Sequence, residues 1–166
     1  MPIEFVAGDL SANAYKEGAK MQLWYWIIAV VALLWNLLGC AFLSMEIFAQ
    51  EAMMKSMTED QKAWARSIPL WIYFVYAVAV STGVAGSIGL FLRKDWTIAL
   101  FAICLVAVLV QMGYTMVIAG GLRVMGPSGA VMPSVVIIIA AALLGFSWFA
   151  SSQNWFAQVG PTIEPK

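Results

Sequence analysis

The residues of this chain that could do chemistry are a few polar side chains set inside long apolar runs. Asn36 and Glu46 interrupt the stretch WNLLGCAFLSME, and Gln111, Tyr114 and Thr115 follow the spacing i, i+3, i+4 of one helix face. Amide, hydroxyl and aromatic side chains of this kind can hydrogen-bond a neutral solute such as a sugar. They can also bond one helix to another inside a membrane. The types and spacing therefore indicate either a small polar pocket or interhelical hydrogen bonds.

The same residues argue against an enzyme. General acid–base catalysis needs a second carboxylate, a histidine or a metal beside Glu46, and its apolar run supplies none. The chain contains no histidine, which is the commonest metal ligand and general base. Cys40 and Cys104 both stand in apolar runs, where a free cysteine packs as a small hydrophobe. We expect no catalytic residue, no cofactor and no metal site.

The composition identifies lipid as the main solvent of the chain. Hydrophobic residues make up 63% of the 166 residues and charged residues only 11%, against roughly 45–50% and about 25% in globular proteins. Nine basic residues balance nine acidic ones, so no basic field would attract nucleic acid. We expect membrane lipids around the protein and no nucleic acid as a partner.

The apolar runs predict an all-α integral membrane fold. A helix needs about 20 apolar residues to cross a membrane, and four segments are long enough. We predict an up-down bundle of four transmembrane helices with a short interfacial helix between the first two. The predicted parts are a polar N-terminal segment (1–20), a transmembrane domain (21–151) with spans at about 21–48, 70–92, 96–119 and 133–150, and a C-terminal tail (152–166).

Residues at the ends of these runs fit helix termini. Pro69 and Pro133 stand where the second and fourth spans open, since proline lacks an N–H that the first turn does not use. Asp95 is placed to cap the third span after the tight turn LRKDW. Thr58 and Gln61 match a capping box that would start the interfacial helix. The side of that helix expected to face the membrane holds Ala63, Trp64, Ser67 and Ile68.

The depth of the polar residues predicts which of them can meet. Asn36 lies about 13 Å inside the hydrocarbon at 1.5 Å per residue, close to the middle of the membrane. We expect its amide to face the bundle interior and to bond Ser81, Thr82 or Gln111. Glu46 lies near the far interface, where its carboxylate could meet Lys55 or Arg66.

A pocket and a packing seam are the two structures that these spans could build. In one interpretation a small uncharged pocket opens outward between the first three spans; in the other the same residues bond helices in a sealed bundle. The candidates are Asn36, Ser44, Glu46, Ser81, Thr82, Gln111, Tyr114 and Thr115. Small residues that would let backbones approach closely are Gly39 in the first span and Ala79, Gly83, Gly86 and Ser87 in the second.

Loop charges and aromatic residues orient the spans. Arg93 and Lys94 fill a minimal loop directly at the span ends, where the positive-inside rule counts most. Because an even number of spans returns the chain to its starting side, we expect both termini in the cytoplasm. Interfacial aromatic belts are predicted at Trp24, Tyr25, Trp26, Trp71, Tyr73, Trp96, Trp148 and Trp155.

Several motifs taken together resemble a family of small bacterial inner-membrane proteins with four helices. They are LLWNLLGC, IPLW, AVAVSTGVAGSIGLFLRKDW, LVAVLVQM and VMPSVVIIIAAALL, spread over about residues 24–150. The resemblance implies a multi-pass protein of the bacterial inner membrane, and members of that family are often labelled sugar transporters. The residues that match its pattern are Trp35, Asn36, Gly39, Pro69, Trp71, Gly83, Gly86, Arg93, Trp96 and Gln111.

Two functions from different classes fit these observations. The first is an accessory or interaction subunit of a membrane assembly, which needs no charged relay and no cofactor. The alternative is a transporter or channel component for a small neutral solute such as a sugar. Because one four-helix bundle rich in Gly and Leu leaves little room for a hydrated solute, transport would require a homo-oligomer. Both readings predict a homo-oligomer or a larger membrane complex.

Overall fold

The computed structural model describes residues 3–153, with side chains from residue 23 onward. All regular structure in this part of the chain is helical, and four long helices, α1, α4, α5 and α7, form the bundle. In chain order the elements are α1 (Ile3–Phe48), α2 (Gln50–Met54), α3 (Glu59–Ser67), α4 (Leu70–Phe91), α5 (Trp96–Gly113), the π-helical turn η1 (Tyr114–Ile118), α6 (Gly121–Met125), the short 3₁₀ helix η2 (Pro127–Ala130) and α7 (Val131–Ser152).

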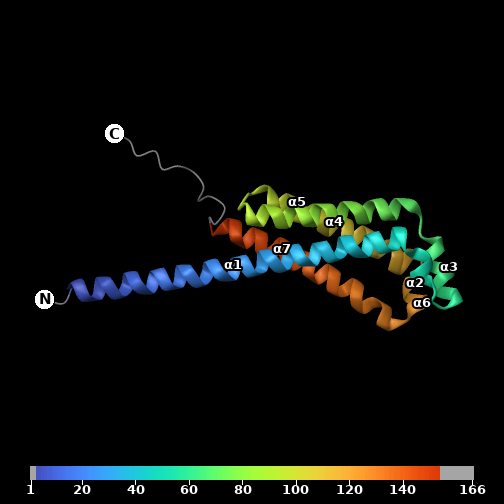
Figure 1. Ribbon diagram of the computed structural model, residues 1–166, viewed down its shortest axis with the longest axis horizontal. Coiled ribbons are helices and arrows are strands. Elements are labelled where there is room, and N and C mark those ends of the chain that lie inside the picture. Colours follow the sequence, from blue (N-terminus) through green and yellow to red (C-terminus); the bar gives the residue numbers. More distant parts are fainter. Residues whose placement is uncertain (1–2, 154–166) are drawn as a thin grey trace.

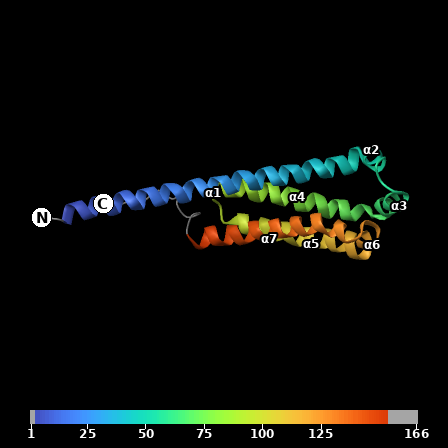
Figure 2. The same ribbon diagram turned by 90° about the horizontal axis from the view of Figure 1, so that it is seen from below.

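The four long helices run alternately up and down, so the bundle has two distinct ends (Figures 1 and 2). The α4–α5 turn lies at one end, which we call the Arg93 end. The short elements α2, α3 and α6 lie at the other, which we call the α3 end. The first part of α1 projects well beyond the Arg93 end, on the side where α7 also finishes. The predicted up-down bundle, with a short helix between the first two spans, is confirmed.

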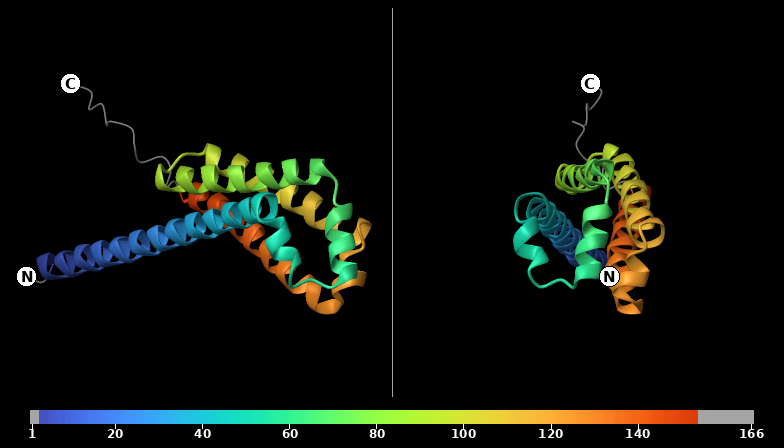
Figure 3. Two further views of the ribbon diagram at one scale, coloured as in Figure 1. Left: turned by 45° about the vertical axis from the view of Figure 1, so that its right-hand side comes forward. Right: turned by 90° about the vertical axis from the view of Figure 1, so that its right-hand side faces the viewer.

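Neighbouring helices pack in the order α1, α4, α5, α7. α4 packs against α1 and α5, and α5 also packs against α7. α1 and α7 meet at the Arg93 end, where the rings of Tyr25 and Phe146 lie 5.8 Å apart. Seen along the bundle from the opposite end, α3 lies across the space between α1 and α7 (Figure 3). The bundle is therefore closed by direct helix contact at one end and covered by a short helix at the other.

Within the described residues, four helical segments are long and apolar enough to cross a membrane. Their mean hydropathy lies between 1.7 and 2.4. The four predicted spans are thus confirmed with small shifts at their ends, and the chain is a membrane protein with an all-α fold. The segments are Leu23–Phe48, Leu70–Phe91, Trp96–Ile118 and Pro127–Ser152.

One helix is longer than its span, and one span starts earlier than predicted. The polar N-terminal segment before the first span is itself helical, because α1 already begins at Ile3 and continues through it into the span Leu23–Phe48. Its Ala, Lys and Glu residues are good helix formers, and no proline interrupts them. The fourth span starts earlier than expected, since α7 begins at Val131 and Pro133 is its third residue. Proline is still tolerated there, because the N–H groups of the first turn have no partner within the helix.

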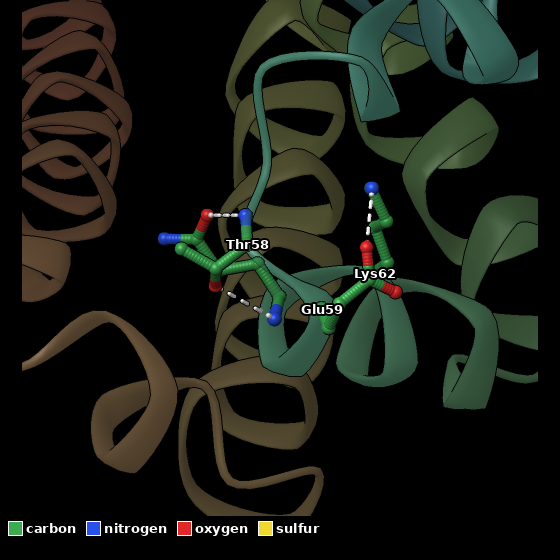
Figure 4. A network of polar contacts seen from close by, with 4 residues as sticks. Thr58, Glu59 and Lys62 are labelled. Carbon is green, nitrogen blue, oxygen red and sulfur yellow. Dashed lines mark hydrogen bonds and ion pairs between the residues drawn. The ribbon is translucent and has the colours of Figure 1, made fainter.

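The caps follow the sequence at two helices and depart from it at a third. Pro69 is the N-cap of α4, as predicted. Thr58 and Gln61 form the predicted capping box of α3, with bonds of 3.0 and 3.3 Å between backbone and side chain (Figure 4). Asp95 occupies the N-cap position of α5 but makes no capping bond with its side chain. Its backbone is helical (φ −64°, ψ −27°), whereas a capping side chain needs an extended residue.

Two of the four α3 residues predicted to face the membrane, Trp64 and Ile68, instead face the bundle. Trp64 donates its indole N–H to the carbonyl oxygen of Thr115 at 3.3 Å, and Ile68 lines a cavity between the helices. Ala63 and Ser67 remain exposed. The prediction placed Trp64 in lipid because it treated α3 as an isolated amphipathic helix, whereas a buried indole N–H needs an acceptor. α3 is therefore a cover of the bundle.

Arg93 contacts several neighbours at the Arg93 end of the bundle. Its backbone conformation is unusual for a residue other than glycine. Its φ is +50°, in the left-handed region that glycine normally occupies at the end of a helix. The N–H groups of Arg93 and Lys94 bond the carbonyls of Leu90 and Gly89, each at 3.1 Å, which is the Schellman pattern. The guanidinium of Arg93 lies 5.6 and 5.7 Å from the ring centres of Tyr25 and Trp26.

Tyr25 is part of the core at this end and not of an aromatic belt. Only 3% of its surface is exposed, and its hydroxyl donates to the carbonyl oxygen of Leu90. The belt prediction for Tyr25 is therefore wrong, because a hydroxyl that finds a carbonyl inside the bundle does not need the membrane surface. The exposed tryptophans Trp24, Trp71, Trp96 and Trp148 fit the prediction, whereas Trp155 lies outside the described residues.

Candidate ligand-binding cavity

A cavity of about 250 Å³ lies between the long helices at the α3 end. Its wall is built from α1, α3, α4, α5, η1, α6, η2 and α7, so nearly every element contributes. Apolar side chains make up most of the wall, including Met112, Met116, Met125 and Met132. The polar and aromatic side chains in the wall are Glu46, Trp64, Tyr73, Tyr76, Gln111 and Thr115.

The local backbone that builds the wall departs from regular α-helix. The last turn of the third span is a π-helix, Tyr114–Ile118, and such turns are frequent at functional sites. Thr115 in this turn donates to the carbonyl oxygen of Gln111 at 2.9 Å. Gly120 and Gly126 then adopt positive φ values of 78° and 70°, which reverse the chain around α6. This segment turns α6 and η2 back over the cavity.

Gln111 presents an amide to the cavity that has no hydrogen-bond partner among the described residues. Only 7% of its surface is exposed, and the bond from Thr115 reaches its backbone carbonyl, not its side chain. The amide atoms keep contact with the cavity space, because Thr97 Oγ1 is the one fully buried side-chain polar atom without a partner among the described residues. Such an amide is typical of a site that another molecule fills.

Glu46 is the one charged residue among the described residues that line the cavity. It lies in the last turn of α1 and is half-buried. The expected ion pair with Lys55 or Arg66 does not form, since Glu59–Lys62 is the one ion pair found in the described part of the chain. Glu46 also lines a neighbouring groove together with Arg66 and Gln50. The carboxylate therefore stands between the cavity and this groove.

Two tyrosines of α4 complete the aromatic side of the wall. Tyr76 is held in place by its hydroxyl, which donates to the carbonyl oxygen of Gly39 at 3.3 Å. Tyr73 lines both the cavity and the neighbouring groove, as Glu46 does. Trp64 of α3 lines the cavity with them. Three aromatic residues, one carboxylate and one amide thus share a wall with the methionines.

Asn36 faces the bundle interior as predicted, but its partner is a different residue. Its amide nitrogen donates to the carbonyl oxygen of Ala32 at 2.8 Å and to the hydroxyl of Ser87 at 3.2 Å. The predicted partners Ser81, Thr82 and Gln111 do not bond it. Counting rise along the helices placed Ser81 and Thr82 at a similar depth, whereas the face of α4 that meets α1 holds Gly83 and Ser87.

Four other predicted candidates also lie apart from the cavity. Ser44 and Thr82 donate to carbonyls one turn earlier in their own helices, at 2.8 and 2.7 Å. Serine and threonine in a helix satisfy themselves in this way and need no neighbour. Ser81 is exposed, and the ring of Tyr114 packs against Trp71 with centres 5.0 Å apart. Of the predicted pocket residues, the structure brings together Glu46, Gln111 and Thr115.

The structure places Gly39, Gly83 and Ser87 at the contact between α1 and α4, whereas Ala79 and Gly86 of the predicted seam face α5. A Cβ atom added at Gly83 would lie 1.9 Å from the side-chain oxygen of Asn36, so only glycine fits there. A Cβ at Gly39 would approach Val80 to 3.2 Å. The α4 face toward α5 is equally close, because a Cβ at Gly86 would meet the ring of Phe101 at 3.1 Å. Ala79 and Ser87 are buried on the same helix.

The sequence prediction did not include Trp64, Tyr73, Tyr76 or the methionines among the pocket residues. Tyr73 and Tyr76 stand three residues apart, so their shared helix face was a usable signal. The position of Trp64 over the cavity depends on how α3 folds back, and no spacing in the sequence encodes that turn.

No protein-family model, curated protein or solved structure matches the chain. The family resemblance drawn from its motifs therefore stays a prediction. Among the described residues, no group of three or more His, Cys, Asp or Glu could hold a metal ion.

Proposed function

We propose that this membrane protein binds a small solute in the cavity at the α3 end and acts as a subunit of a larger membrane assembly. The observation that carries the proposal is the amide of Gln111, which lines the cavity and makes no hydrogen bond to the described residues. A ligand that supplies hydrogen bonds would satisfy it. Ligand sites in general are concave and mostly apolar, with a few polar groups that fix orientation.

The packing of the bundle favours a binding subunit over a complete pathway. The cavity is confined to the α3 end, while Leu90 and Phe101 fill the Arg93 end with at most 1% of their surfaces exposed. Between the two ends Asn36 and Ser87 bond each other. A solute crossing the membrane would therefore need additional chains, which supports a homo-oligomer or a larger complex.

The loop charges support an orientation with both termini in the cytoplasm. Arg93 and Lys94 form the short turn between α4 and α5, and short basic loops are retained on the cytoplasmic side. The cavity and α3 would then face the outside of the cell. The motif resemblance supports the bacterial inner membrane as the location.

Thermal unfolding of the purified protein in lipid nanodiscs tests the proposal. Neutral sugars, amino acids and small amines are added one class at a time, and at least one class should raise the melting temperature of the native chain. Gln111→Met should lose this rise without unfolding earlier, because it replaces an amide that makes no hydrogen bond in the protein with an apolar side chain of similar size. Ser81→Ala, at an exposed position, is the control and should respond like the native chain. A rise that persists in Gln111→Met contradicts the proposal, and so does a panel without any effect.

The resemblance to a family with a sugar-transporter label favours a second candidate function, which is uptake of a neutral solute by an oligomer of this chain. Proteoliposomes that contain the purified chain alone would then accumulate a sugar found in the binding screen. Copurification of a different chain in equal amount, with no uptake by the isolated protein, would instead favour the accessory subunit.

A further inference from the structure

We infer that the solute bound in this cavity carries a substituted ammonium group, so that its ligand class is small organic cations. The inference rests on the proposed function, since it names the ligand of the same site. Three features of the wall support it: a single charge of negative sign, aromatic rings on two helices, and an otherwise apolar, methionine-rich surface.

The charge of the wall selects for a cation. Within the part of the chain that the structure describes, Glu46 is the one ionisable acid or base that lines the cavity apart from the tyrosine hydroxyls, and no Lys or Arg lines it. A carboxylate in a membrane span is unfavourable unless a partner offsets its charge. A positively charged ligand would be such a partner, whereas a neutral sugar would leave Glu46 uncompensated.

The rings of the wall recognise the shape of a substituted ammonium group. Trp64 of α3 and Tyr73 and Tyr76 of α4 line the cavity together with Glu46. The faces of such rings attract cations, and quaternary ammonium groups are commonly bound between them. The methionine side chains add an apolar and adaptable surface for alkyl substituents. A hard metal cation fits poorly, since Ca²⁺ requires about six to eight oxygen ligands.

Arg66 is the competing partner for Glu46. It lines the neighbouring groove with Glu46 but not the cavity, and the two side chains form no ion pair. Because Glu46 and Tyr73 belong to both walls, the groove and the cavity meet at the carboxylate. Removal of the Arg66 charge should therefore strengthen cation binding.

Titration calorimetry in nanodiscs tests the inference with tetramethylammonium, choline and benzyltrimethylammonium as probes. Each is compared with its uncharged carbon isostere, which for choline is dimethylbutanol. We expect at least one cation to bind the native chain at least tenfold more tightly than its isostere. Glu46→Gln should weaken cation binding at least tenfold and leave the isostere unchanged. Glu51→Gln, which removes an exposed acid on α2, is the matched control and should have no effect.

Two further variants separate the rings from the charge. Tyr73→Phe keeps the ring and should bind the cation as the native chain does, whereas Tyr73→Leu should weaken binding severalfold. Arg66→Ala should tighten binding.

The results distinguish failure of the inference from failure of the proposed function. If sugars or the isosteres bind as well as the cations, and Gln111→Met abolishes that binding while Glu46→Gln does not, the site binds solutes but the cation assignment is wrong. If no cation of the series binds the native chain, the assignment is also overturned. If additionally no solute of the wider panel raises the melting temperature, the proposed function fails with it.

Discussion

The side chain of Asn36 packs so closely against Gly83 that no room remains for a Cβ atom at this glycine. The amide of Asn36 lies over the backbone of Gly83 and reaches Ser87 one turn further along α4. An amide in the middle of a membrane must be paired, and a neighbouring glycine makes room for it. At this one contact, α1 and α4 are therefore held together both by close packing and by a hydrogen bond.

Gly83→Ala should destabilise the protein strongly. The new Cβ would lie 1.9 Å from the Asn36 oxygen, so the helices must separate or the Asn36–Ser87 bond must break. We expect a loss of about 1–3 kcal/mol, typical of overpacking, measured by unfolding in mixed detergent micelles. Gly145→Ala is the matched control, since a Cβ there meets nothing within 4 Å. Equal losses for both variants would show that the contact does not limit packing.

Arg93 combines an unfavourable backbone conformation with favourable contacts of its side chain. A non-glycine residue at positive φ is destabilised by about 1–2 kcal/mol. The guanidinium offsets an amount of this order through its contacts with the rings of Tyr25 and Trp26, at about 0.5–1 kcal/mol per contact.

The variants Arg93→Ala and Arg93→Gly separate these two effects. Both lose the contacts with the rings, but only glycine also relieves the backbone. We expect Arg93→Ala to be less stable than Arg93→Gly by about 1 kcal/mol, with Arg93→Gly close to the native chain in thermal unfolding. If the alanine variant were as stable as the glycine variant, the left-handed conformation would carry no strain.

At the scale of the element, α3 depends on its cap more than the long helices do. It has nine residues and contains no buried residue, and so short a helix is marginal without packing or capping. The Thr58–Gln61 capping box and the indole bond of Trp64 hold it over the cavity. Loosening of the cap should therefore uncover the site.

Thr58→Ala should destabilise α3 locally by about 1 kcal/mol through loss of the cap. The measurement is amide hydrogen exchange, which should accelerate about fivefold in α3 and remain unchanged in α4. Thr58→Ser keeps the capping oxygen and should restore the native exchange rate. Faster exchange throughout the bundle would mean that α3 is part of the core and not a separate cover.

Acid should also loosen α3, through the pair of Glu59 and Lys62. The hydrogen bond from Lys62, at 2.7 Å, and its charge hold the pKa of Glu59 below its ordinary value. Ionised Glu59 therefore contributes to the stability of α3. This contribution is fully present above the ordinary pKa of a glutamate and is lost as the pH falls through the lowered pKa of Glu59. Because Glu59 is exposed, the effect should be small. We expect amide exchange of α3, corrected for its intrinsic pH dependence, to accelerate slightly at low pH in the native chain. The Glu59→Gln variant should not show this acceleration.

The elements themselves could be read from the sequence because each depends on local signals. Apolar run lengths gave the four spans, and Thr58 and Pro69 marked helix starts through bonds within a few residues. Asp95 was misjudged because the Schellman turn before it fixes its backbone. A side chain can cap a helix only when the backbone of its residue is extended, and the preceding turn determines that backbone conformation.

At the scale of the whole molecule, the two ends of the bundle should lie on opposite sides of the membrane. Ser56 precedes α3, and Lys94 lies in the α4–α5 turn at the other end. Single cysteines at these positions, in a chain with Cys40 and Cys104 replaced by alanine, should react with an impermeant maleimide in opposite ways. We expect labelling of Ser56→Cys and not of Lys94→Cys in intact cells. Labelling of both from one side would contradict the topology.

The cavity was only partly predictable because it depends on how distant elements meet. Glu46, Gln111 and Thr115 were predicted as pocket residues from their depth and helical spacing, and all three line the wall. Trp64 reaches it only because α3 folds back over the bundle. Asn36 was assigned the wrong partner because depth along a helix does not fix rotation about its axis. Rotation is set by packing against neighbours, which no single helix encodes.

The two hydrogen bonds of Asn36 have a consequence for how the chain is made at the ribosome. One bond goes to Ala32 in the same helix, and the other waits for Ser87 of α4. When α1 leaves the translocon alone, one of the two N–H groups of the Asn36 amide already has its acceptor within the helix. The first span can therefore enter lipid before the next span is synthesised. Arrival of α4 then supplies the remaining partner. We expect the first two spans to associate during translation, ahead of the pair that follows.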